Sequence, residues 1–300
     1  MALEPLKDST VLVIGEARGV ADEDAGSSRI RAIRSSANLW VPFGIFAMIA
    51  LACFVWPEIY PVRAPIDGDL AFANLPPLSP HYLLGTDPLG NDILSRLLYG
   101  GRVSIEVGLG SNAIGMIIGA LLGTSAGYLG GLAESGIMRA LDMLLGFPPL
   151  VLSLVLVTYL GPSEIHVIWA ISIFFIPAFA RLARAATLRL RELNFVVASK
   201  LCGTPGWRIV LRHIVPNVLP QLMTFAFLGT AIAIIIEAAL SFLGLGVPPP
   251  GPSWGNMISV GQTYLATNEY LVIIPSGCLF LTVLSLNLLG DALRVRWSGR

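Results

Sequence analysis

Residues 107–133 read VGLGSNAIGMIIGALLGTSAGYLGGLA and contain no Asp, Glu, Lys or Arg over 27 positions. A helix of about 20 apolar residues crosses the hydrocarbon core of a bilayer, so this stretch is long enough to span one. Gly115, Gly119, Gly123 and Gly127 recur every four residues, which places them on one face of a helix. This stripe predicts a face that another helix approaches closely.

Five further uncharged stretches predict additional spans, at 35–57, 143–163, 165–180, 213–236 and 270–290. The sequence therefore predicts an all-α membrane protein with six transmembrane helices in a lipid bilayer. Its composition agrees, because 55% of the residues are hydrophobic and 13% are charged, about half the charged share of a soluble domain. A soluble enzyme is excluded, and a net charge of zero argues against a nucleic-acid partner.

Basic residues are distributed unevenly among the connections. Sixteen of the 19 Lys and Arg residues fall on one side of the predicted spans and three on the other. Because cytoplasmic connections are enriched in Lys and Arg, we expect both termini in the cytoplasm. The predicted organisation is a cytoplasmic tail (1–38), a first transmembrane helix (39–57), an extracytoplasmic segment (58–101), a five-helix core (102–292) that includes a cytoplasmic connection (181–217), and a cytoplasmic tail (293–300).

Two sequence patterns bear on catalysis. Residues 123–127, Gly-Thr-Ser-Ala-Gly, match the G-x-S-x-G of hydrolases, but they end an apolar helix and the last span contains no His. Helix packing therefore explains this pattern better than an intramembrane hydrolase does. The two lysines, Lys7 and Lys200, do not follow a Gly, so the chain has no G-x-x-x-x-G-K phosphate-binding loop. We expect no catalytic residue, no metal site and no bound cofactor in this chain.

Glu237 is the ionisable residue that lies deepest in a predicted span, whereas Glu106, Asp142 and Asp291 lie at predicted helix ends. Ionisable groups inside a membrane are costly and usually have a function or a partner. Two interpretations remain open: a polar site that faces a pathway or a partner, and a structural residue bonded to a neighbouring helix.

The connection 181–217 is long for a loop in a compact helical bundle and alternates apolar residues with arginines. Gly203-Thr204-Pro205-Gly206 interrupts it, and a second short helix is expected to begin at Trp207 and to end at Pro216. Two short helices around a glycine turn suit a docking site for another protein. An interfacial helix lying on anionic lipid fits the same periodicity, so this pattern alone leaves both alternatives open.

The order of residues in this connection resembles the EAA loop of ABC-importer permeases. That loop reads EAA, three residues, Gly, nine residues and then I-x-L-P; here Val197-Ala198-Ser199 is followed by Gly203 and by His213-Ile214-Val215-Pro216. Val197 stands where the family has Glu, so an ion pair from that position is missing. The resemblance implies an ATPase-coupling loop that includes Val197, Ala198, Ser199, Lys200, Leu201, Cys202, Gly203, Trp207, Arg208 and Pro216.

Three further stretches resemble the C-type permease subunit of dipeptide, oligopeptide and nickel importers. Residues 81–100 are similar to its H-x-x-GTD-x-LGRD-x-x-SR-x-x-YG stretch, with Asn91 in place of the usual Arg. Residues 138–148 resemble the start of its third helix, and residues 240–255 resemble its outer loop before the sixth helix. The similarity covers about residues 81–297 and implies a type I ABC importer transmembrane fold.

This resemblance implies a complex in a bacterial or archaeal inner membrane. The expected partners are a homologous B-type permease, two cytoplasmic ATP-binding subunits that hold ATP and Mg, and an extracytoplasmic peptide-binding protein or lipoprotein. Peptides are the expected cargo; nickel or another small solute is the alternative within the family. An autonomous secondary transporter is disfavoured, because the two halves show no inverted repeat and the connection 181–217 has no counterpart in the first half.

Thr86, Asp87, Asp92 and Trp254 are candidates for docking on the extracytoplasmic face. For Asp87 the alternative is structural, because an Asp followed by Pro88 suits the N-cap and first position of a short helix. The structural interpretation is the more economical one for Asp87 alone.

Overall fold

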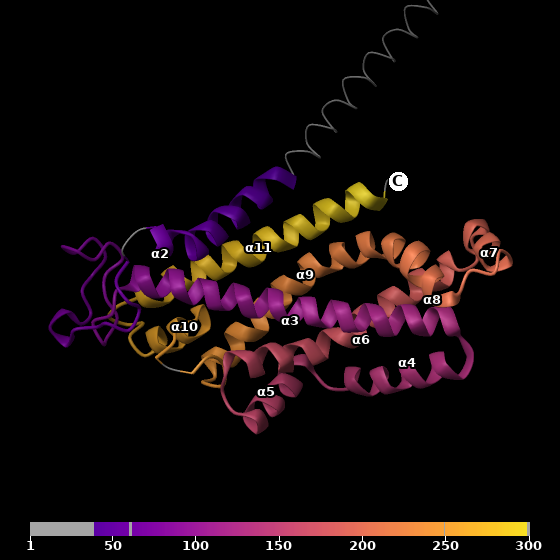
Figure 1. Cartoon of the computed structure of the whole chain (residues 1–300). Coiled ribbons are helices and arrows are strands. Elements are labelled where there is room, and N and C mark those ends of the chain that lie inside the picture. The colour runs from indigo at the N-terminus through magenta and orange to yellow at the C-terminus, as the bar shows by residue number, and fades with distance from the viewer. Residues whose placement is uncertain (1–38, 60–61, 249, 299–300) are drawn as a thin grey trace, which may run out of the picture.

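The computed structural model describes residues 39–59, 62–248 and 250–298 (Figure 1), and the named elements in these residues are all helices. The predicted tail 1–38 and the last two residues of the predicted tail 293–300 lie outside the described residues. Five helices are long and apolar enough to cross a membrane: Leu39–Ile59 with its last turn α2 (Trp56–Ile59), α3 (Ile93–Leu129), α6 (Glu164–Leu190), the helix Gly206–Phe242 and α11 (Tyr270–Ser298).

Shorter elements connect them. They are η1 (Leu70–Phe72), α4 (Gly131–Leu145), α5 (Pro149–Leu160), α7 (Asn194–Leu201) and α10 (Trp254–Gln262). α7 lies at one end of the bundle, and residues 62–92 lie with α10 at the opposite end (Figure 1). We call these the α7 end and the loop end.

The glycine stripe forms the contact between α3 and α6, which confirms the packing interpretation of these glycines. Gly115 faces Phe175 and Gly127 faces Thr187, so residue numbers rise together and the two helices run parallel. A parallel pair requires the chain to return between them. α4 and α5, which together pass the test for a span but are bent by 87°, make that return. Together with the five straight helices, this bent pair gives six passages, and it is the third of them along the chain.

The prediction of a single straight helix over 143–163 was wrong. α4 ends at Leu145, and Gly146 and Pro148 separate it from α5. α4 is also tied to α6, because Arg181 donates to Asp142 at 2.7 Å and the Nε of Arg184 donates to Glu134 at 2.6 Å. Proline at the start of α5 fits its first turn but cannot continue α4, which explains the break.

Other helices extend beyond the uncharged stretches that predicted them. α3 begins at Ile93, inside the predicted extracytoplasmic segment 58–101, and α6 continues to Leu190, inside the predicted connection 181–217. α11 extends through the predicted tail from residue 293, so Asp291 lies within a helix rather than at its end. Glu106 also lies within α3, where it accepts from Arg102.

Pro216 does not end a short helix, contrary to the sequence prediction. α8 (Gly206–Ile209), the π-helical turn η2 (Val210–Ile214) and α9 (Val215–Phe242) form one continuous helix. The wider π turn, in which the N–H of Val215 donates to Val210, immediately precedes Pro216. This change of register accommodates a proline that has no N–H to donate.

α9 runs antiparallel to α3 and completes the hydrophobic core. The side-chain amide of Asn112 on α3 donates to the carbonyl of Ala226 at 2.8 Å and to the hydroxyl of Thr230 at 3.0 Å. Phe175 and Phe179 of α6 pack in the same core, and Phe179 meets Phe225 of α9 edge to face. The helices α3, α6 and α9 therefore form one packed unit.

We expect Gly123→Ala to destabilise the bundle by about 1–3 kcal/mol, the usual effect of overpacking a tight contact. A Cβ at this position would lie 2.8 Å from the Cα of Ala180, so the helix backbones would have to separate. Thermal unfolding of the purified chain in detergent measures the effect. Gly277→Ala is the matched control, because a Cβ there meets nothing within 4 Å. Equal melting temperatures for both variants would contradict the close approach.

Candidate functional site

α7 and the turn after it form a protruding hairpin at the α7 end. Its C-terminus has the Schellman geometry: the N–H of Gly203 donates to Lys200 and the N–H of Thr204 donates to Ser199. Gly203 has a φ of +75°, a left-handed conformation that glycine adopts without strain. The predicted turn at Gly203 is therefore present, and it returns the chain to α8.

The hairpin is attached by one side and exposed on the other. Val196 is fully buried in the bundle core, and the ammonium of Lys200 lies 5.0 Å from the ring centre of Tyr128 on α3. Leu201, by contrast, is 85% exposed, and apolar side chains next to it are also exposed, namely Phe195, Val197, Trp207 and Leu211. α7 projects past the ends of the long helices (Figure 1). This placement favours a docking site over a helix that lies flat on lipid.

The remaining predicted members of the coupling loop lie on the hairpin or directly beside it, with the exception of Pro216. Ala198 and Cys202 are exposed on the hairpin, and Ser199 bonds its own helix at the carbonyl of Phe195. Arg208 stacks over Trp207 at 5.2 Å. Pro216 lies apart from this hairpin, in the first turn of α9.

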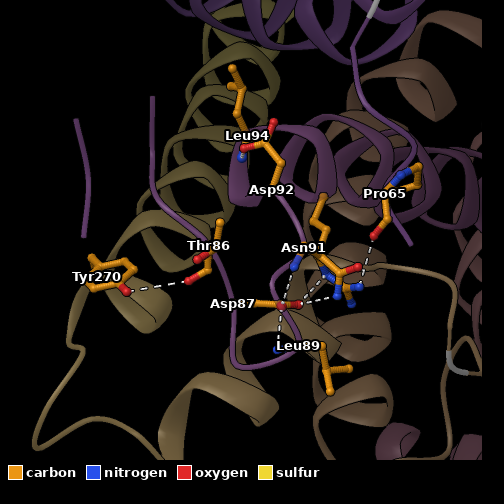
Figure 2. Close-up of polar contacts among 9 residues, drawn as sticks. Pro65, Thr86, Asp87, Leu89, Asn91, Asp92, Leu94 and Tyr270 are labelled. Atoms are coloured by element: carbon orange, nitrogen blue, oxygen red, sulfur yellow. Dashed lines mark hydrogen bonds and ion pairs between the residues drawn. The ribbon is translucent and has the colours of Figure 1, made fainter. Parts of the chain in front are cut away.

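At the loop end, Asp87 organises residues 62–92. One carboxylate oxygen accepts from the backbone N–H of Leu89 and of Asn91, at 2.8 and 2.9 Å. The other accepts from the side-chain amide of Asn91 at 2.8 Å and lies 3.5 Å from Nε of Arg96 (Figure 2). Arg96 also donates to the carbonyl of Pro65. Asn91, which replaces the usual Arg, is therefore a partner of Asp87.

Neighbouring residues anchor the same segment to the helices. The hydroxyl of Thr86 donates to the carbonyl of Phe72, and the hydroxyl of Tyr270 on α11 lies 3.5 Å from the carbonyl of Thr86 (Figure 2). Asp92 is the N-cap of α3, where it accepts from the N–H of Leu94 at 3.1 Å. Partial burial raises the pKa of the Asp92 carboxyl above its ordinary value, although that N–H opposes the shift.

These positions bear on the predicted docking residues. Thr86 and Trp254 are fully buried and Asp87 is 7% exposed, so their side chains do not form the outer surface. Asp92 is half-buried. The surface of this segment is instead formed by exposed leucines, namely Leu70, Leu78, Leu83 and Leu89. The polar residues hold the shape of that surface, and a docking role stays a prediction.

Glu237 is fully buried where α9, α3 and the loop before α10 meet. The hydroxyl of Ser241 donates to its Oε1 at 2.6 Å. The hydroxyls of Ser104 and Ser253 lie beside the carboxyl, but Oε2 has no hydrogen bond within the described residues. Ser104 in turn accepts from the backbone N–H of Trp254 at 3.3 Å. A fully buried side chain does not line an open pathway, so this arrangement favours a structural role for Glu237, although its hydrogen bond from Ser241 lies within α9 itself.

Trp254 closes the same junction. Its indole N–H donates to the carbonyl of Leu97 at 3.0 Å, and its ring lies against Gly101 of α3. Close packing of Gly255 against Ala238 brings α10 onto α9. Sequence reasoning did not identify Ser104 or Ser253 as partners of Glu237, because nothing local in the sequence marks residues so far apart as neighbours.

The chain thus folds as five long helices and one bent helix pair, with a protruding short helix, α7, between the fourth and the fifth passage. The structure is similar to a chain of the MetNI methionine ABC transporter in an inward-facing conformation, with a TM-score of 0.55 and 18% identity, covering 67% of this chain and 95% of that one. This likeness establishes the fold.

The sequence relatives establish the family. Residues 115–299 match the family described as binding-protein-dependent transport system inner membrane component. The glutathione transport system permease protein GsiD of Pectobacterium atrosepticum is 40% identical over 85% of this chain and 84% of its own length. The di/tripeptide transport system permease protein DppC of Pseudomonas aeruginosa is 42% identical over 71% of this chain and 70% of its own. The chain belongs to this family and is a multi-pass permease subunit, and its resemblance to the C-type permeases is confirmed.

We expect Asp87→Asn to loosen residues 62–92, because it removes the charge that faces buried Arg96. Leaving one member of a buried ion pair without its partner costs about 3–5 kcal/mol. Limited proteolysis of the purified protein should show faster cleavage in this segment. Asp67→Asn, at an exposed position, should leave the cleavage rate unchanged. Identical rates for Asp87→Asn and the native protein would rule out the organising role.

Glu237→Ala should lower assembly and transport together, because it leaves a cavity at a fully buried position where α9, α3 and the loop before α10 meet. The buried hydroxyl of Ser241 also loses its acceptor, and leaving a buried donor unsatisfied costs about 1–3 kcal/mol. Glu237→Gln, which keeps the size and an acceptor oxygen, should retain most of both. Membrane abundance and uptake by the complete transporter are the two readouts. Loss of uptake with full abundance in Glu237→Ala would instead support a pathway role.

Proposed function

We propose that this chain is one of two permease subunits of an ATP-driven peptide importer, with the α7 hairpin as its contact to an ATPase subunit. The observation that carries the proposal is the exposed apolar face of the hairpin at the end of a packed bundle. In water such a face is unfavourable, and an exposed apolar patch is typical of a protein interaction site.

The hairpin is well placed to transmit movement. α7 follows α6 after a short link and continues through α8 and η2 into α9, so both neighbouring passages end at it. α6 and α9 pack against α3 in the common core. A displacement of α7 by an ATPase would therefore act on three helices at once, and the π turn η2 is the point at which α9 adjusts to it.

The orientation in this proposal follows from the basic residues. The α7 end faces the cytoplasm, where ATP is available, and the loop end faces the cargo-delivering partner. ATP and Mg are held by the partner ATPases, and a homologous B-type permease completes the pathway. Peptides are the proposed cargo class, because relatives that match over most of this chain are named as permeases of dipeptide, di/tripeptide and glutathione transport systems.

We expect Leu201→Glu to abolish or strongly reduce co-purification of the ATPase subunits, because it places a charge at the most exposed apolar position of α7. The bundle should still fold, since this side chain is 85% exposed. Leu78→Glu is the matched control: it is 81% exposed but lies at the loop end. Affinity purification of the permease pair, followed by quantification of bound ATPase subunits, measures the effect. Full retention of the ATPases by Leu201→Glu would overturn the assignment of the hairpin.

A further inference from the structure

A groove of about 770 Å³ opens at the α7 end between α6, α9 and α11. Arg189 near the end of α6 and Arg294 near the end of α11 contribute to its wall. Both arginines are exposed, and neither has an ion pair or hydrogen bond among the described residues. Among the described residues, no Asp or Glu lines the groove. The charged side chains of its described lining are therefore both positive.

The third wall is a polar face on an apolar helix. Asn217, Gln221, Thr224 and Leu228 of α9 line the groove, and their spacing places them on one helical face. Amide side chains facing hydrocarbon are costly, so this face borders water or protein rather than lipid tails. The amide of Gln221 is exposed and makes no hydrogen bond within the described residues. The amide of Asn217 already donates to the carbonyl of His213, so the groove offers the Gln221 amide and two guanidinium groups without partners among the described residues.

This set of groups suits a small anion with an apolar body. A guanidinium binds a carboxylate through two parallel hydrogen bonds, and these charge-assisted bonds are stronger than neutral ones. The indole of Trp297 and the ring of Phe225 supply apolar surface in the same groove. A few polar groups on an otherwise apolar wall are typical of small-molecule sites.

From these contacts we propose that the groove binds the C-terminal carboxylate of the peptide cargo at the cytoplasmic end of the pathway, through Arg189 and Arg294. This inference rests on the proposed function. The peptide is the source of the carboxylate, Gln221 donates to it, and the aromatic rings contact the adjoining side chain. The groove-lining half of α9 continues from the α7 hairpin through η2, so the site lies next to the contact with the ATPase.

The test uses the complete transporter in nanodiscs of phosphatidylcholine, without the binding protein. Binding of radiolabelled alanyl-alanine and of its C-terminal amide is measured by scintillation proximity. The native complex should bind the free acid at least tenfold more tightly than the amide. The double variant Arg189→Gln with Arg294→Gln should lose that preference by weakening acid binding alone. Arg296→Gln, on the same helix but outside the groove, should bind as the native complex does. Equal binding of acid and amide by the native complex, or an unchanged preference in the double variant, would overturn the proposal.

A second experiment tests whether the groove binds a lipid headgroup instead of the peptide carboxylate. Native mass spectrometry after reconstitution with phosphatidylglycerol should show the same number of retained lipids on the native complex and the double variant. Loss of a retained lipid in the double variant, with unchanged peptide binding, would overturn the proposal in favour of a lipid site. ATPase co-purification and ATP hydrolysis are measured on the same preparations. If both are intact, a negative binding result removes the groove assignment and leaves the proposed function standing.

Discussion

The parallel contact between α3 and α6 is the constraint on which the rest of the structure depends. Four glycines on α3 let the two backbones approach so closely that Gly123 lies against the backbone of Ala180. In a membrane, where lipid removes the usual hydrophobic drive between helices, such close packing is a main source of association. Because the pair is parallel, the chain must cross back between its members, and the bent pair α4 and α5 provides that crossing.

This arrangement separates two differently built ends. At the α7 end, Val196 fixes a short hairpin whose remaining apolar residues are exposed. At the loop end, polar side chains are turned inward: Asp87 accepts from the side-chain amide of Asn91, and Glu237 accepts from the hydroxyl of Ser241. The first end presents a surface for a partner, and the second keeps a long irregular segment in one shape without a sheet or a disulfide among the described residues. Helices α3, α6 and α9 join the two.

The sequence predicted the class, the passages and the glycine face, because each depends on composition or on helical spacing. The sequence-based prediction placed helix boundaries poorly where charged residues inside a helix form ion pairs. Counting charge-free stretches began α3 too late and ended α6 too early, since Arg102 pairs with Glu58 and Glu106, and Arg181 pairs with Asp142. It also could not decide the role of Glu237, which depends on Ser104 and Ser253 from segments far apart in the chain. The Gly203 turn was predictable because left-handed backbone favours glycine.

Cysteine labelling across the membrane tests the six-passage bundle most directly. A chain with Cys53, Cys202 and Cys278 replaced by alanine would carry one new cysteine, either at Leu83, which is 58% exposed at the loop end, or at exposed Arg296 of α11. Five passages separate these positions, so a membrane-impermeant maleimide should label the first in intact cells and the second only after permeabilisation. Labelling of both positions from the same side would mean that α4 and α5 do not cross, and would contradict the parallel pair.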